Sequence, residues 1–265
     1  MGASSSIRRV RSWIFCLAPV FMIATWGCNN SAVSESNGRG EMVVLEADAT
    51  QAASAKVEAA GRLRAEFHLR EATRLYREAL DLYRRSDPDL KSVEAARCKR
   101  LLAQVLTDQG EHGAAEALAV ESYLQMKERY PTEEFPLGSE ELARSMWLLA
   151  SIWMATDRTG EAEALYRDAV LWFWADQPAG YETALLLMDT GDCLTRVMKY
   201  QEAENALKIA YTHLREQRGS DAPETIEAFH RLIELYELWG RPERAEQIRL
   251  EASEQKPTTP TTGGR

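Results

Sequence analysis

A short motif recurs five times along the chain, at intervals of 43, 47, 41 and 42 residues. It consists of Ala-Glu with another small residue seven positions after the Ala, and Thr73 replaces Glu in the first copy. The five starting alanines, here called the anchors, are Ala72, Ala115, Ala162, Ala203 and Ala245. A period of this length indicates repeated supersecondary units that stack on their neighbours and share one continuous core.

Two further positions recur in the same register. The residue twelve before the anchor is small in four copies and isoleucine in the fifth: Ala60, Ala103, Ala150, Gly191 and Ile233. The residue five before the anchor is glycine or aspartate in three copies, whereas the other two depart: Gly110, Asp157, Gly240, Phe67 and Met198. Apolar residues at helical spacing lie on both sides of this position. The pattern predicts two amphipathic helices joined by a tight turn, with small residues where the helix axes cross.

The segment from Leu102-Ala103 through Gln109-Gly110 to Ala115-Glu116-Ala117-Leu118 resembles the tetratricopeptide repeat. Trp239-Gly240 to Ala245-Glu246, and the inter-repeat residues 219–225, are similar to the longer form of about 42 residues found in kinesin light chains. The resemblance covers residues 53–255. It implies an all-α, right-handed α-solenoid of about five hairpins within residues 51–255, acting as a non-catalytic interaction scaffold. The interval of 47 predicts a longer loop around residues 131–138.

The start of the chain has the pattern of an export signal. Arg8, Arg9 and Arg11 precede an apolar run at residues 13–27, and a helix of fifteen residues rises only about 22 Å. Residues 1–27 are therefore expected to be a signal peptide. Thr25-Trp26-Gly27-Cys28 resembles a bacterial lipoprotein box, which implies lipidation of Cys28 and a tether on the periplasmic side of a bacterial membrane. The alternatives are a simple cleaved signal, an uncleaved anchor, or myristoylation at Gly2.

Polar, aperiodic sequence flanks the repeats. Residues 28–50 are expected to form a flexible linker, and residues 256–265, rich in Pro, Thr and Gly, a disordered tail.

Charge and residue types argue against several functions. The net charge is −9, and residues 1–27 contribute +3, so the remaining 29 basic and 41 acidic residues give −12. Binding to nucleic acid through bulk electrostatics is therefore not expected. The four histidines are scattered, and no phosphate-binding loop or nucleophile elbow occurs. Cys98 and Cys193 lie two repeats apart, too far for a disulfide. The sequence predicts no catalytic site, no metal site and no cofactor.

In the tetratricopeptide family the first helix of each hairpin lines an inner groove. The register assigns the following residues to that groove: Arg97, Arg100 and Gln104; Arg144, Trp147, Ser151 and Met154; Leu185, Met188, Asp192, Thr195 and Arg196; Glu227, His230, Glu234 and Glu237. Their order predicts a surface that is basic, then apolar, then acidic.

A peptide bound in this groove would place its acidic end toward the arginines and its basic end toward the glutamates. The alternative is an ordinary solvated helix face, with Trp147 in the core. Two other functions stay open at this point: an extracytoplasmic sensor for a small ligand, and an enzyme whose site the sequence does not reveal.

Three consecutive aromatic residues, Trp172-Phe173-Trp174, stand near the end of a second helix. Each residue advances by about 100° around a helix, so all three cannot face the core. At least one is expected to be exposed or covered by a neighbouring segment. Core packing and a self-association patch are the two interpretations.

Overall fold

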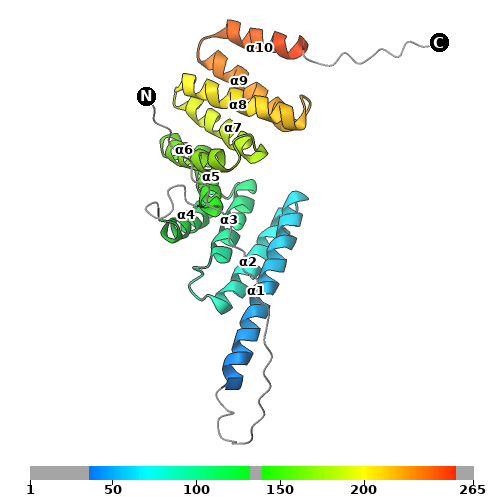
Figure 1. Ribbon diagram of the computed structural model, residues 1–265, viewed down its shortest axis with the longest axis vertical. Coiled ribbons are helices and arrows are strands. Elements are labelled where there is room, and N and C mark those ends of the chain that lie inside the picture. The colour runs from blue at the N-terminus through cyan, green and yellow to red at the C-terminus, as the bar shows by residue number, and fades with distance from the viewer. Residues whose placement is uncertain (1–35, 132–138, 255–265) are drawn as a thin grey trace, which may run out of the picture. The chain divides into compact units, whose positions relative to one another are not determined.

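The structure, a computed structural model, describes the backbone of residues 36–131 and 139–254, and the side chains of residues 48–131 and 139–250. The described residues form helices without strands (Figure 1). The helices are α1 (Ser36–Ala65), α2 (Leu69–Ser86), α3 (Val93–Asp108), α4 (His112–Arg129), α5 (Glu140–Ala155), α6 (Thr159–Asp176), α7 (Tyr181–Arg196), α8 (Tyr200–Arg218), α9 (Pro223–Leu238) and α10 (Pro242–Glu254). The chain divides after Met42, and the stack of helices belongs to the part from Val43 onward.

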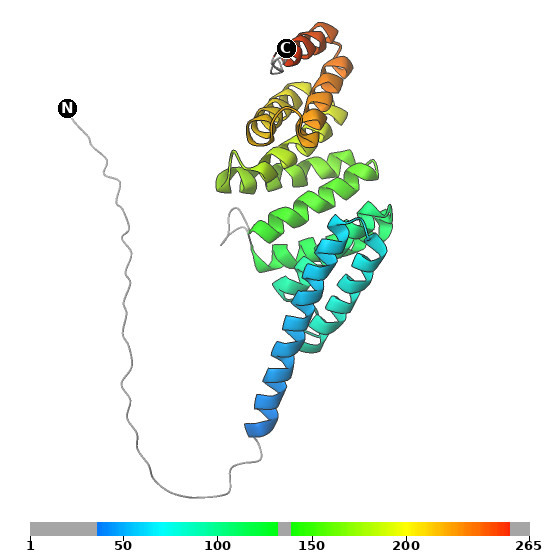
Figure 2. The same cartoon turned by 90° about the vertical axis from the view of Figure 1, so that its right-hand side faces the viewer.

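Consecutive helices pair as hairpins, and the hairpins stack in chain order (Figures 1 and 2). The second helix of each hairpin packs on the first helix of the next, as α4 does on α5 and α6 on α7. First helices also contact one another, through α3 with α5, α5 with α7, and α7 with α9. Side-chain bonds such as Lys56 Nζ to Glu78 Oε2 (2.6 Å) join α1 to α2. The fold is a right-handed α-solenoid of five hairpins, as the sequence predicted.

The turn position has the same backbone conformation in all five hairpins. The residues with positive φ at the turns are Phe67 (61°), Gly110 (80°), Asp157 (60°), Met198 (62°) and Gly240 (73°). After each, the chain returns a backbone N–H to the first helix, as from Glu111 to the carbonyl of Leu106 at 2.8 Å. This closure is the helix-ending motif that normally favours glycine. The repeat register therefore holds even where the side chain does not suit the conformation.

The small residues lie at helix crossings. Ala60, Ala103 and Ala150 are fully buried. A Cβ atom placed on Gly191 would lie 2.5 Å from Cγ of Leu207, which is itself fully buried. Such a distance is well inside van der Waals contact, so α7 and α8 approach this closely only because residue 191 has no side chain.

The recurring glutamate after the anchor connects the second, third and fourth hairpins to the hairpin that follows each. Glu116 accepts a hydrogen bond from Trp153 Nε1 at 2.9 Å and pairs with Arg158. Glu163 pairs with Lys199 at 2.6 Å, and Glu204 accepts a hydrogen bond from the hydroxyl of Tyr236, also at 2.6 Å. In each case the donor belongs to the following hairpin. The motif thus marks a junction between hairpins as well as a position within one.

The helical part begins earlier than the sequence suggested. Residues 36–50, expected to belong to a flexible linker, lie within α1. No proline interrupts residues 36–65, and the alanine-rich sequence from residue 47 favours helix, so the weak periodicity did not prevent helix formation. The connection from α4 to α5 runs from residue 130 to 139, longer than residues 177–180 between α6 and α7, as the interval of 47 predicted.

Both termini and the segment 132–138 lie outside the described residues, and with them the expected signal peptide, Cys28 and the tail at 256–265. Within the described ranges, no helix combines the length and apolar character needed to cross a membrane.

Candidate interaction surface on the first helices

A pocket of about 370 Å³ lies between the first helices of three successive hairpins, α3, α5 and α7. We call it the central pocket. It is lined by Arg100, Gln104, Thr107, Asp108, Arg144, Trp147, Leu148, Ser151, Tyr181, Glu182, Leu185 and Asp189. Each helix contributes positions three, four or seven residues apart, because such positions share one helix face.

Six of the predicted groove residues meet in the central pocket: Arg100, Gln104, Arg144, Trp147, Ser151 and Leu185. Trp147 is half-buried, and its indole Nε1 donates to Oδ2 of Asp189 at 2.9 Å. Its ring meets the Phe173 ring edge-on, with centroids 5.8 Å apart. Trp147 therefore contacts the core on one side and the pocket on the other. It is both a groove residue and a core residue, whereas from the sequence these two roles were alternatives.

The arginines of the pocket are already paired within the chain. Arg100 is buried, and its Nη2 lies 2.9 Å from Oε2 of Glu141. Arg144 forms two bonds to Glu182, the shorter at 2.6 Å. Arg97 is exposed and also reaches Glu141, at 3.5 Å. The acidic end of a peptide would therefore compete with Glu141 and Glu182 for these arginines, and its binding to them stays a prediction.

A polar chain that the sequence did not predict crosses three hairpins. Asp189 on α7 accepts from Trp147 on α5 and lies 3.0 Å from Nη1 of Arg231 on α9. Arg231 also pairs with Glu227 at 2.9 Å. Partial burial raises the pKa of Asp189, and its two donors oppose that rise. Asp189 and Arg231 both stand fourteen residues before an anchor, so they occupy the same position in successive repeats. Opposite charges at one repeat position could have predicted this pair from the sequence.

The apolar middle of the predicted groove keeps only some of its predicted residues. Met154 and Met188 are buried in the two core clusters, and Thr195 is buried as well. The expectation that these methionines line the groove is therefore wrong. Of the predicted apolar residues Trp147 and Leu185 line the pocket, and Leu148 and Tyr181 join them.

The acidic end of the predicted groove forms a separate feature, which we call the terminal hollow. It has a volume of about 680 Å³ and is lined by Phe229, His230, Ile233, Glu234, Glu237 and Arg249. Between it and the central pocket, Asp192 and Arg196 pair with each other on α7 at 3.5 Å. The predicted residues thus form two sites rather than one continuous groove.

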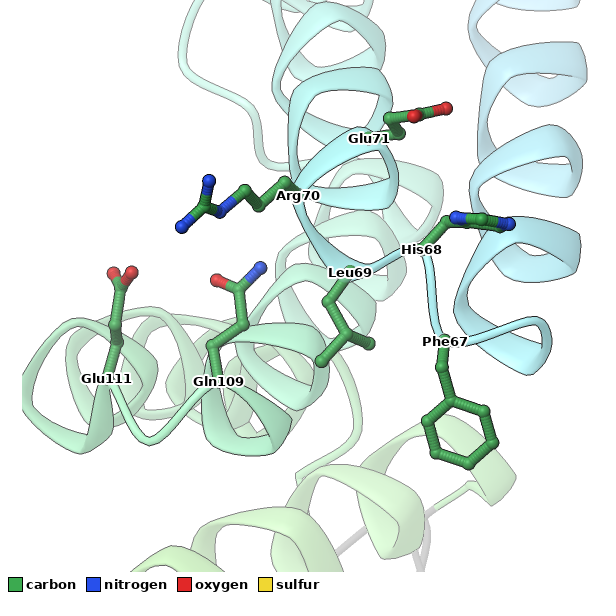
Figure 3. A pocket seen from close by; sticks show the side chains of 7 residues that line it. All are labelled: Phe67, His68, Leu69, Arg70, Glu71, Gln109 and Glu111. Carbon is green, nitrogen blue, oxygen red and sulfur yellow. The ribbon is translucent and has the colours of Figure 1, made fainter.

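A third hollow, of about 580 Å³, lies between the turns of the first two hairpins (Figure 3). Arg70, Gln109 and Glu111 point into the space between the turns, whereas the Phe67 ring points away from them (Figure 3). Phe67 is 85% exposed. This hollow contains no predicted groove residue.

The aromatic triplet divides as helix geometry requires. Phe173 is buried, Trp172 is half-buried with its ring 5.1 Å from that of Phe173, and Trp174 is exposed. The expectation of at least one exposed ring is confirmed. Self-association through Trp174 stays a prediction.

The described side chains offer little to catalysis. They include no group of three or more His, Cys, Asp or Glu residues placed to hold a metal ion. Cys98 and Cys193 are unpaired, and burial raises their pKa values to about 12 and about 11. A thiol is nucleophilic only as its thiolate, so neither cysteine is activated.

Comparison with known proteins identifies the fold. No family model matches the sequence, and no curated protein matches it. A putative kinesin light chain with nearly identical TPR-like repeats from Podosopora anserina superposes with a TM-score of 0.64, over 78% of this chain and 94% of that one, at 15% identity. The chain has the tetratricopeptide-repeat fold.

Two other tetratricopeptide-fold structures extend the comparison. BtubC (BKLC) from P. vanneervenii has a TM-score of 0.56 at 20% identity and covers 84% of this chain and 97% of that one. YrrB, described as a TPR protein with an unusual peptide-binding site, has a TM-score of 0.50 at 16% identity, over 77% of this chain and 86% of that one. At these identities the likeness concerns the fold alone.

Proposed function

We propose that the protein is a non-catalytic scaffold that binds a segment of a partner protein across α3, α5 and α7. The observation that carries the proposal is the central pocket, which three successive hairpins build together. Trp147, Tyr181 and Leu185 offer it aromatic and aliphatic surface of the kind that protein interfaces favour. The peptide-binding site of the YrrB neighbour supports the same use of the fold.

The pairing of the arginines determines what kind of segment fits. Because Glu141 and Glu182 already neutralise Arg100 and Arg144, the pocket favours an uncharged anchor over a carboxylate. Gln104 is half-buried, and its carboxamide has no hydrogen-bond partner among the described residues. It can therefore donate to and accept from the backbone of an extended segment. An apolar or aromatic side chain in the pocket, with its backbone at Gln104, satisfies both features.

The test is photo-cross-linking in cells that express the protein, with a photoreactive amino acid in place of Leu185. Trp147→Ala is expected to reduce the yield of the cross-linked partner at least tenfold, because it removes the largest apolar surface of the pocket. Trp174→Ala removes an indole outside the pocket and serves as the matched control. Gln104→Ala tests the site with a smaller change in packing. Retention of the partner by both Trp147→Ala and Gln104→Ala, in folded protein, rejects the proposal.

The proposal includes display outside the cytoplasm, with the chain tethered through a lipid on Cys28. Its support is the basic, apolar and small-residue order of residues 8–28. Metabolic labelling with palmitate and membrane fractionation provide the test. The wild-type chain is expected to be labelled and membrane-bound, and Cys28→Ser unlabelled. Equal fractionation of the two chains without label argues against the tether.

A further inference from the structure

Among the described residues, α9 and α10 form the last hairpin, and one face of α9 has no described helix packed against it. From α3 onward, each first helix contacts the next one, as α5 contacts α7 and α7 contacts α9. In the described part of the chain, no helix takes that position against α9 (Figures 1 and 2). The face in question contains the terminal hollow.

This face is apolar at its centre. Phe229 and Ile233 form the floor of the terminal hollow. Ile226 lies on the same stripe, seven residues before Ile233, and 42% of it is exposed. Ile233 stands twelve residues before the anchor, where the earlier hairpins have small residues, and it packs into the core with only 9% exposed. The accessible part of the stripe is therefore the exposed Ile226 and the half-buried Phe229, and apolar surface next to charged residues is typical of an interaction site.

The rim of the hollow is acidic. Glu234 is exposed and has no partner among the described side chains, and Glu237 pairs with the exposed Arg249 at 2.6 Å. The net charge of the first helices runs from +1 in α3 through −1 in α5 and −2 in α7 to −3 in α9. The negative charge is therefore largest where the stack ends.

The charge pattern at internal junctions shows what the terminal face lacks. At two of them the preceding helix presents an arginine to a glutamate at the start of the next one, Arg100 to Glu141 and Arg144 to Glu182. At the junction of α7 with α9 the hydroxyl of Tyr181 donates to Glu224 instead. At the position of Arg144, α9 has Glu227 instead. A helix with glutamates at its start would meet like charge here, whereas a helix with basic residues would meet opposite charge.

We propose that the terminal hollow docks an amphipathic helix of a partner protein, in which lysine or arginine residues flank an apolar stripe. The helix takes the place that the first helix of a sixth hairpin would occupy. Its apolar stripe covers Ile226, Phe229 and Ile233, and its basic residues face Glu234 and Glu237. This is helix-in-groove recognition with the sign of the charge set by the groove. The surface is separate from the central pocket, so either proposal can fail alone.

The experiment uses the purified full chain and two synthetic 18-residue helical peptides with the same leucine stripe. One peptide has lysine flanks and the other glutamate flanks. Fluorescence anisotropy is expected to show binding of the lysine peptide, with the glutamate peptide at least tenfold weaker. The double variant Glu234→Lys/Glu237→Lys is expected to weaken the lysine peptide at least tenfold and to bind the glutamate peptide better than wild type does.

The control variant Glu58→Lys/Glu128→Lys changes the net charge equally on exposed residues of α1 and α4. Equal binding of both peptides, no binding of the lysine peptide up to millimolar concentration, or equal weakening by the control overturns the inference. So does a wild-type dimer that Glu234→Lys/Glu237→Lys dissociates, since a second copy is then the occupant. Trp147→Ala must leave lysine-peptide binding unchanged, because loss of binding would place the peptide in the central pocket.

Discussion

Replacing Gly191 by alanine is expected to destabilise the protein, although alanine is the better helix former. In the middle of α7 the substitution gains about 1 kcal/mol of helix propensity. The new Cβ would lie 2.5 Å from Cγ and 2.7 Å from Cδ2 of Leu207. Leu207 is fully buried and cannot move aside freely, so we take the upper end of overpacking penalties, about 3 kcal/mol. The net expectation is a loss of about 2 kcal/mol in the free energy of unfolding.

The same substitution is expected to change sign when Leu207 is alanine. Leu207→Ala alone removes a buried side chain and is expected to cost about 3 kcal/mol. In that background the clash is absent, so Gly191→Ala gains its helix propensity of about 1 kcal/mol. The coupling energy between the two sites is then about 3 kcal/mol, which is large for a pair without charge.

Urea unfolding followed by circular dichroism at 222 nm measures these differences, and hydrogen exchange in α7 and α8 localises them. Gly61→Ala is the matched control, since a Cβ at Gly61 would meet only the Tyr76 hydroxyl, at an ordinary 3.7 Å. It is expected to stabilise α1 by up to about 1 kcal/mol. The expected clash is refuted if Gly191→Ala raises the free energy of unfolding as much as Gly61→Ala does. It is also refuted if Gly191→Ala lowers that free energy equally in wild type and in the Leu207→Ala variant.

Phe67→Gly is expected to raise the free energy of unfolding by up to about 1 kcal/mol, because φ is 61° at this exposed turn and glycine adopts positive φ without strain. Urea unfolding measures the change, and an unchanged or lower urea midpoint contradicts the prediction. In a variant with Cys16 and Cys28 replaced by serine, alkylation of Cys98 and Cys193 at pH 8 should be slow in the folded protein and fast in urea. Fast alkylation of the folded protein would contradict the burial and the raised pKa values of these two thiols. The raised pKa of Asp189 means that its ionisation favours the unfolded state. The unfolding free energy of wild type relative to Asp189→Asn should therefore fall as pH rises from about 4 through the folded-state pKa of Asp189, and a difference that rises over this range refutes the shift.

The fold was predictable because five copies multiply a weak local signal. No single turn residue specifies a hairpin, and Phe67 and Met198 taken alone argue against one. Their distance to the next anchor nevertheless assigned both to turns, and both have positive φ. The small-residue column in the same way placed Gly191 at a helix crossing. Register is a property of the whole repeat, so it tolerates an unsuitable residue at one position.

The candidate site was less predictable, because register fixes a position along a helix but not its rotation or its partners. Arg100 and Arg144 were placed on the correct face, yet their partners lie 41 and 38 residues further along the chain. The anchors of the repeats concerned are 47 and 41 residues apart, so in neither pair do the two partners stand at the same position of the repeat. Met188 stands fifteen residues before its anchor, as Trp147 does, but it is buried in the core whereas Trp147 lines the pocket.

The separation of the groove into two sites follows from how charge is compensated along the stack. An internal first helix shares polar contacts with the first helices before and after it. Asp189 on α7 illustrates this, since it accepts from Trp147 on α5 and from Arg231 on α9. The first helix of the last described hairpin, α9, contacts α7 through Arg231 and Glu224. No described helix follows it to supply a partner for Glu234. A stack held together by pairing between successive hairpins therefore leaves Glu234 unpaired at its last described hairpin, and this negative charge favours a basic group in whatever docks there.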